Sequence, residues 1–112
     1  MSVDTALQAA LDPLEIPYSP NRYTGTAVEY ITTNYQTVPE VYAERAPRAA
    51  RHLVQVHYYL PIGRNPNATV RTISRALWNQ GFTWPGVVNA SDEDGLHFVL
   101  ECEYVNGGGY YG

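Results

Sequence analysis

The sequence has few charged residues, no lysine and a single cysteine. Charged residues make up 16% of the 112 residues, against about 25% in typical soluble domains. Cys102 has no partner for an intramolecular disulfide, which argues against a disulfide-stabilised secreted scaffold. The net charge of −4 argues against a nucleic-acid-binding domain that depends on bulk positive charge.

Long apolar runs are missing as well. No run approaches the roughly 20 residues that a membrane-spanning helix needs, and the N-terminal segment lacks the pattern of a secretory signal. We therefore expect an intracellular protein with one domain, residues 1–105, followed by a flexible Gly/Tyr-rich tail, residues 106–112.

Tyrosine is abundant, with ten in the chain. Its ring offers a large contact area with a polar tip, and it is enriched at protein interfaces. A tyrosine-rich, charge-poor surface favours a protein that binds other protein chains.

Residue periodicity predicts two helices and four to five strands. The apolar residues of segment 2–11 fall on one helical stripe with Ser2 as N-cap, and a second helix is expected from the Asn65 cap to a stop at Gly81. Strands are expected at 27–36, 52–60, 82–88 and 96–105, with a short one around Tyr23. The Arg-bearing segment 37–50 is expected to be a connecting loop. This order predicts an α+β fold, a mostly antiparallel sheet of about four to five strands packed by two helices.

Motifs for catalysis are lacking. The chain has no G-x-S-x-G turn, no Gly-rich phosphate loop and no H-E-x-x-H helix. Cys102 falls on the inward face of the last strand, where a cysteine behaves as a small apolar residue. The acidic run at residues 92–95 departs from a calcium loop, because its glycine and its ligand positions do not match. We therefore predict that the protein is not an enzyme and has no catalytic, cofactor-binding or metal-binding residue.

Three groups of residues are candidate contact surfaces. Arg71, Arg75 and Trp78 recur at i, i+4 and i+7 on the outer side of the second helix, the composition of an interface hot spot, although Trp78 packing on the domain's own loop is an equal alternative. Glu101 and Glu103 lie with His97 on the outward face of the last strand, where we expect them to meet arginines of a neighbouring subunit; a plain polar surface is the alternative. The tail ends in two tyrosines that can order on a neighbour, Tyr110 and Tyr111.

A further group of arginines lies in and beside the expected loop. In a ring, they would face a channel filled with DNA; a solvated loop is the alternative. The arginines of this group are Arg45, Arg48 and Arg51.

The second half of the chain carries a family resemblance. The run Leu53-Val-Gln-Val-His-Tyr-Tyr-Leu-Pro, the helix through Ile73 and Leu77 to Gly81-Phe82, and the segment Asp94-Gly-Leu-His-Phe-Val-Leu-Glu-Cys-Glu-Tyr follow one another. This order of elements, over about residues 30–105, resembles the small bacteriophage tail-terminator and tail-completion (head–tail joining) proteins.

The resemblance implies a structural virion protein at the junction of tail and head, made in the host cytoplasm. It would form a ring, expected to be a hexamer, that ends tail-tube polymerisation and joins the tail to the head connector. Its partners would be copies of itself, the major tail tube protein and the neck proteins, with passive contact to passing DNA, and it would use no cofactor. A head-completion or neck protein is the alternative within this class. A small ligand-binding or enzymatic α+β domain, with His52 beside Cys102, and a DNA-binding module are alternatives from other classes.

Overall fold

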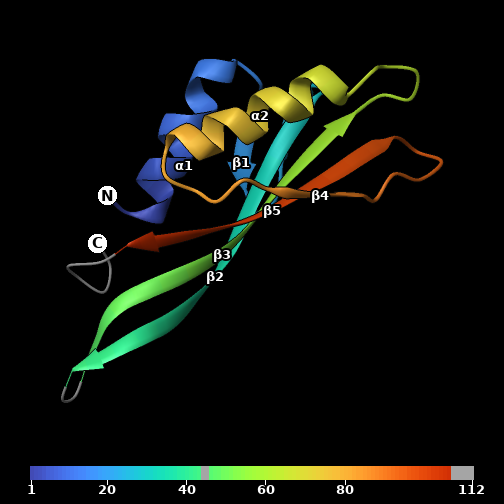
Figure 1. Ribbon diagram of the computed structural model, residues 1–112. Coiled ribbons are helices and arrows are strands. Elements are labelled where there is room, and N and C mark those ends of the chain that lie inside the picture. Colours follow the sequence, from blue (N-terminus) through green and yellow to red (C-terminus); the bar gives the residue numbers. More distant parts are fainter. Residues whose placement is uncertain (44–45, 107–112) are drawn as a thin grey trace.

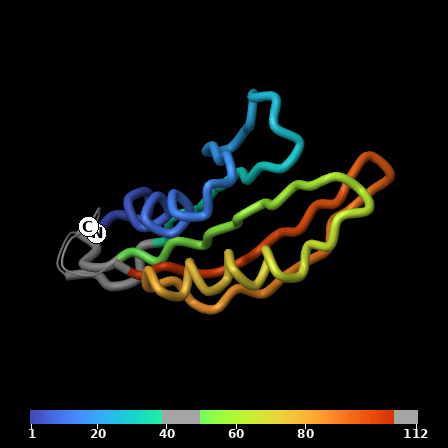
Figure 2. Tube along the Cα trace, turned by 90° about the horizontal axis from the view of Figure 1, so that it is seen from above, coloured from blue at the N-terminus to red at the C-terminus, as the bar shows by residue number. Residues whose placement is uncertain are grey.

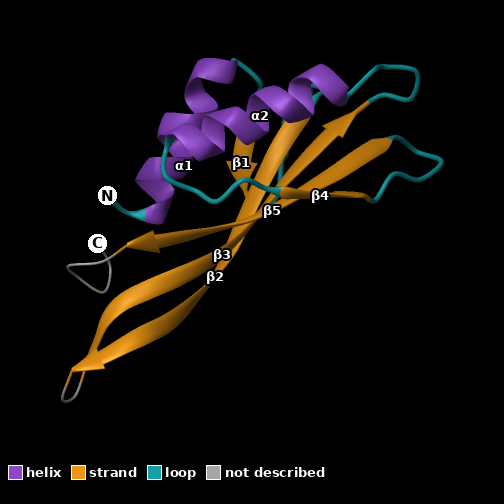
Figure 3. Ribbon diagram, in the orientation of Figure 1, coloured by secondary structure: helices purple, strands orange, loops and turns teal. Residues whose placement is uncertain are grey.

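The computed structural model describes residues 1–43 and 46–106, and for residues 39–43, 46–49 and 106 it describes the backbone alone. The elements in chain order are α1 (Val3–Leu11), the 3-10 turn η1 (Asp12–Leu14), β1 (Tyr18–Pro20), β2 (Tyr30–Ala43), β3 (Ala46–Leu60), α2 (Asn67–Asn79), β4 (Gly86–Asn89) and β5 (Leu96–Asn106). The strands form one five-stranded sheet in the order β1-β2-β3-β5-β4 (Figures 1 and 3). β1 and β2 are parallel and the other pairs are antiparallel, which confirms the α+β fold.

The helix ends follow local signals in the sequence. The Ser2 side chain accepts a hydrogen bond from the Thr5 amide at 3.2 Å, so Ser2 is the N-cap of α1 as predicted. The Asn65 side chain accepts from the Asn67 amide at 3.0 Å, although the residue at the N-cap position of α2 is Pro66 and not Asn65 as predicted. Gly81 stops the helix with φ of +94°, a conformation that glycine adopts without strain.

The core lies between the two helices and one face of the sheet. Alternate residues of β3 from His52 to Leu60 are buried, and β5 contributes Leu100, Cys102 and Tyr104 from the same face. α1 lies nearer β2 and α2 lies beside β4 (Figures 1 and 2). The sheet residues of the main core cluster point to this side, so no second helical layer is needed to bury them. On the opposite face, Thr32 and Val99 are also buried, with 7% and 8% of their surface exposed.

The opposite face of the sheet, here called the open face, is not covered by a helix or strand of the described residues. Its side chains stand in rows that run directly across β2, β3 and β5. From one end to the other, the rows are Tyr30–Tyr59–His97, Thr32–His57–Val99, Asn34–Gln55–Glu101, Gln36–Leu53–Glu103 and Val38–Arg51–Val105.

The segment 37–50 corrects the sequence prediction, because it is not a loop. β2 continues to Ala43 and β3 begins at Ala46, so the two strands form a long hairpin. β5 ends opposite Ala50. Residues 39–43 and 46–49, here called the arm, pair only with one another and, at Pro39, with Ala50 among the described residues. The arm projects beyond the helices and gives the molecule principal extents of 54 × 25 × 25 Å (Figure 1). The radius of gyration is 15.1 Å, against roughly 13 Å for a compact domain of this length.

Other strand boundaries also moved. The short strand expected around Tyr23 is β1, which ends at Pro20. The strand expected over residues 82–88 begins only at Gly86, after Pro85. The shift has a physical cause, since proline has no amide hydrogen to donate to a ladder.

Candidate protein-interaction surfaces

Four aromatic rings form a continuous stack across one end of the open face. Tyr23, from the loop after β1, lies on Tyr30 of β2 with ring centroids 4.5 Å apart. Tyr30 lies 4.7 Å from Tyr59 of β3, and Tyr59 lies 4.2 Å from His97 of β5. The rings are nearly parallel, with interplanar angles of 16–20°. Aromatic pairs that face each other across neighbouring strands stabilise a sheet by roughly 0.2–1 kcal/mol each, so the stack contributes to the pairing of β2, β3 and β5 at this end of the open face.

A histidine pair continues the stack into the next row. His57 Nδ1 lies 2.8 Å from His97 Nε2, so only one of these nitrogens can carry a hydrogen. Burial, together with the neighbouring His97, lowers the pKa of His57, although Glu101 acts in the opposite direction. Burial also lowers the pKa of His97 against the raising effect of Asp92. The pair is therefore neutral at physiological pH, and this part of the open face carries no positive charge.

The other end of the open face is a shallow trough of amide and carboxylate side chains. The Gln55 side-chain amide donates to Glu101 Oε2 at 3.2 Å, and the Arg51 guanidinium lies 3.4 Å from the Glu103 carboxylate. Leu53 is exposed in the middle of the trough and Val105 is exposed beside it. The concavity has a volume of about 600 Å³ and is lined on this face by Asn34, Gln36, Leu53, Gln55, Glu101 and Glu103.

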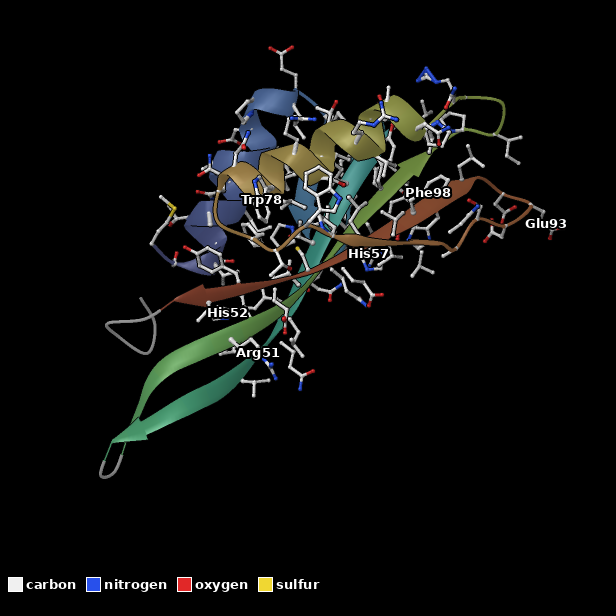
Figure 4. All side chains as sticks on the ribbon, in the orientation of Figure 1. Arg51, His52, His57, Trp78, Glu93 and Phe98 are labelled. Atoms are coloured by element: carbon white, nitrogen blue, oxygen red, sulfur yellow. The ribbon has the colours of Figure 1, made fainter. Side chains whose placement is uncertain are left out.

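A second surface lies on the outer side of α2. Arg71 and Arg75 are exposed there, and neither forms an ion pair with a carboxylate whose side chain the structure describes. Trp78 lies one turn further and contacts Trp84 edge-on, with centroids 6.4 Å apart. The loop contact that was the alternative for Trp78 therefore exists, yet Trp78 remains 57% exposed and Trp84 50% exposed. Figure 4 shows Trp78 on the helix side of the sheet and His57 on the other side.

The candidate contact residues fall into three places. The outer face of α2 brings together Arg71, Arg75 and Trp78, and the open face brings together Glu101 and Glu103, as the sequence indicates. Arg45, Tyr110 and Tyr111 lie outside the described residues, and Arg48 is described only as backbone of β3.

Arg51 and Glu103 were expected to face a channel and a neighbouring subunit, respectively. In the structure, Arg51 Nε lies 3.4 Å from Glu103 Oε1, so the two side chains pair with each other on the open face. The pairing follows from register, because Arg51 lies opposite Val105, and Glu103 lies two residues before Val105 on the same face of β5, as a diagonal neighbour of Arg51. Both expectations stay predictions.

The residues suggested for an enzymatic site are engaged in packing. His52 is 4% exposed, and its Nδ1 lies 2.8 Å from the Thr37 hydroxyl. Burial raises the pKa of the Cys102 thiol to about 12, with a smaller contribution from Glu103. Because a reactive cysteine needs an accessible thiolate, Cys102 is not suited to be a nucleophile.

The sequence did not predict the aromatic stack: it placed His97 on the outward face of the last strand but did not pair it with Tyr59. The available signal was alternation along β3 and β5, and it lacked the register that brings these residues together.

No helix among residues 1–43 and 46–106 is long and apolar enough to cross a membrane. In the same part of the chain, no group of three or more His, Cys, Asp or Glu side chains is arranged to hold a metal ion. Neither the protein-family models nor the curated proteins with which the sequence was compared match it.

Proposed function

We propose that this chain is a structural virion protein, a tail terminator of a long-tailed bacteriophage. Its subunits form a ring, with six copies expected, that ends polymerisation of the tail tube and joins the tail to the head connector. It acts by binding copies of itself, the major tail tube protein and the neck proteins, and it catalyses no reaction. It resides in the virion, at the junction of tail and head.

The observation that carries this proposal is the arm. Two strands of 14 and 15 residues extend beyond the sheet, and their outer part pairs with no third strand in the described residues. A two-stranded ribbon is at best marginally stable in water. Such an element adds little to the stability of its own subunit. Contact with a neighbouring subunit would explain why the chain has it.

The two surfaces described above support the same proposal. The outer face of α2 and the open face lie on opposite sides of a two-layer domain. Contact between unlike faces of identical subunits is heterologous, and such contacts close into a ring when the rotation between neighbours fits. A small ring subunit needs two such faces.

A genetic experiment tests the proposal. We would introduce an early stop codon into this gene in the virus that encodes it and examine the products of infection by electron microscopy. Overlong tails together with filled, unjoined heads are the expected result. Tails of normal length with leaking or tailless heads would instead identify a head-completion or neck protein. Particles of normal number and shape would refute a role in the virion.

A further inference from the structure

We infer that the outer face of α2 in one subunit packs into the open-face trough of the next subunit. This inference rests on the proposed function, because it takes a second copy of this chain as the partner. It names the two faces that meet and the residues that pair across them.

Charge complementarity is the first argument. α2 contains no acidic residue, and its outer face presents Arg71 and Arg75, neither of which pairs with a carboxylate whose side chain the structure describes. The trough presents Glu101 and Glu103. Glu101 accepts from the Gln55 amide, and Glu103 has Arg51 as its cationic neighbour. Each carboxylate has two oxygens and can accept a further hydrogen bond from a guanidinium.

The spacing of the charges is the second argument. Arg71 and Arg75 are one turn apart, about 6 Å along the helix axis. Glu101 and Glu103 point to the same face of β5 and are about 7 Å apart along the strand. When a helix lies along β5, Arg71 can therefore reach Glu101 while Arg75 reaches Glu103.

The direction of the helix follows from Trp78. With α2 running in the same direction as β5, Trp78 passes beyond Glu103 and reaches Leu53 and Val105, which are 37% and 56% exposed. In the reverse direction, it would reach Val99, which is 8% exposed and already covered by its own subunit. A partly exposed tryptophan gains more by covering exposed apolar surface than by meeting buried surface, so the parallel arrangement is favoured.

The layered architecture is consistent with this contact. The sheet has helices on one face and none on the other within the described residues. A helix from the next subunit would supply the missing layer over the trough. The repeat of this contact from subunit to subunit produces a continuous alternation of helix and sheet layers.

A disulfide experiment tests the contact. The full-length chain would carry Arg71→Cys together with Glu101→Cys and would be oxidised under mild conditions. Within one subunit these positions lie on opposite sides of the sheet and cannot form a disulfide with each other, so every new bond joins two subunits. Cys102 is buried and does not interfere. The expected result on a non-reducing gel is a ladder of multimers that ends at a closed ring.

The matched control is Arg22→Cys together with Glu101→Cys, because Arg22 is an exposed arginine in the loop after β1, outside both surfaces. A ladder no stronger than that of the control would overturn the inference. The experiment also works if free subunits associate only weakly, because each disulfide that forms during a brief contact is retained.

A charge-exchange experiment separates the interface from the function. Complementation of the stop-codon virus is expected to fall severalfold with Arg71→Glu or Glu101→Arg and to recover when both are present in one chain. If the wild-type gene complements while the double variant stays as defective as the single ones, the Arg71–Glu101 contact is wrong and the tail-terminator proposal stands. If the stop-codon virus shows no particle defect, the proposed function fails while the disulfide ladder still reports on the interface.

Discussion

The arm can be removed from this protein in a way that tests its role directly. We would replace residues 39–50 with Asn-Gly, so that a two-residue turn joins Val38 to Arg51. These residues are directly opposite in the β2–β3 ladder. The amide of Ile31 and the carbonyl of Thr33 form hydrogen bonds with backbone atoms on the β1 side. In this part of β2, the backbone amide and carbonyl groups of odd-numbered residues therefore point away from β3, and those of even-numbered residues point toward it. Val38 therefore belongs to a hydrogen-bonded pair, which a two-residue type I′ turn such as Asn-Gly can close.

The expected change in the free energy of unfolding is small. Removal of the fully buried Ala50 loses about 0.8 kcal/mol for its methyl group. Shortening the connection from twelve residues to two lowers the cost of closing the chain by up to about 1.5 kcal/mol. The rest of the arm pairs only with itself in the described residues, so its removal leaves the core intact. We expect the free energy of unfolding of the variant to lie within about 1 kcal/mol of that of the wild type.

Urea denaturation followed by the fluorescence of Trp78 and Trp84 measures this change, and complementation of the stop-codon virus measures assembly. The expected result is a folded variant that fails to complement. A loss of about 3 kcal/mol or more, the size of a large core truncation, would refute the view that the arm lies outside the core. Full complementation by a stable variant would refute its role in assembly.

Three further predictions concern the core and the open face. Leu77→Ala removes a fully buried side chain and is expected to cost about 2–5 kcal/mol in urea denaturation, whereas the exposed Asn79→Ala should change stability little. The pKa values of His57 and His97 lie below their ordinary value of 6.5, so the unfolded chain takes up protons at a higher pH than the folded chain. The free energy of unfolding should therefore fall as the pH drops through 6.5. If a double His57→Gln, His97→Gln variant lost as much stability as the wild type over this pH range, the two histidines would not be the cause. The pKa of Cys102, raised to about 12, predicts that thiol reagents label the folded protein slowly and the urea-unfolded protein fast; equal rates would show that the thiol is accessible.

The core could be predicted from the sequence because burial leaves a local pattern. Alternation along β5 identified its buried face, which includes Cys102, and the apolar stripe of α1 with its Ser2 cap identified the first helix. In each case, the physical cause is that one side of the element is in contact with the core, which selects apolar residues at the period of that element.

The arm was not predicted, because its composition is typical of a loop. Its prolines and arginines indicated a loop, yet Pro39 is compatible with the hairpin. The alternation of β2 points the backbone nitrogen of Pro39 away from β3, toward an edge that β1 does not reach, since β1 ends opposite Thr33. The missing amide hydrogen of Pro39 therefore removes no hydrogen bond from the ladder.

The candidate surfaces were partly predictable for a related reason. Helical periodicity is local, so it placed Arg71, Arg75 and Trp78 together correctly. The open face depends on the register between distant strands, and a shift of one residue would move every side chain to the other face. The pairing of Arg51 with Glu103 therefore became visible only in the structure.

If copies of this chain assemble as proposed, the charges on the two surfaces bear on which contact they form. A two-fold dimer through α2 would place Arg71 and Arg75 against their own copies, and a dimer through the open faces would oppose Glu101 and Glu103 in the same way. Like charges in contact are unfavourable, so the contact between unlike faces is preferred, and this contact is heterologous. The rotation between neighbouring subunits then decides between a closed ring and an open filament. A filament continues to add subunits, whereas a ring leaves neither face unoccupied and stops growing, which is the property that a tail terminator requires.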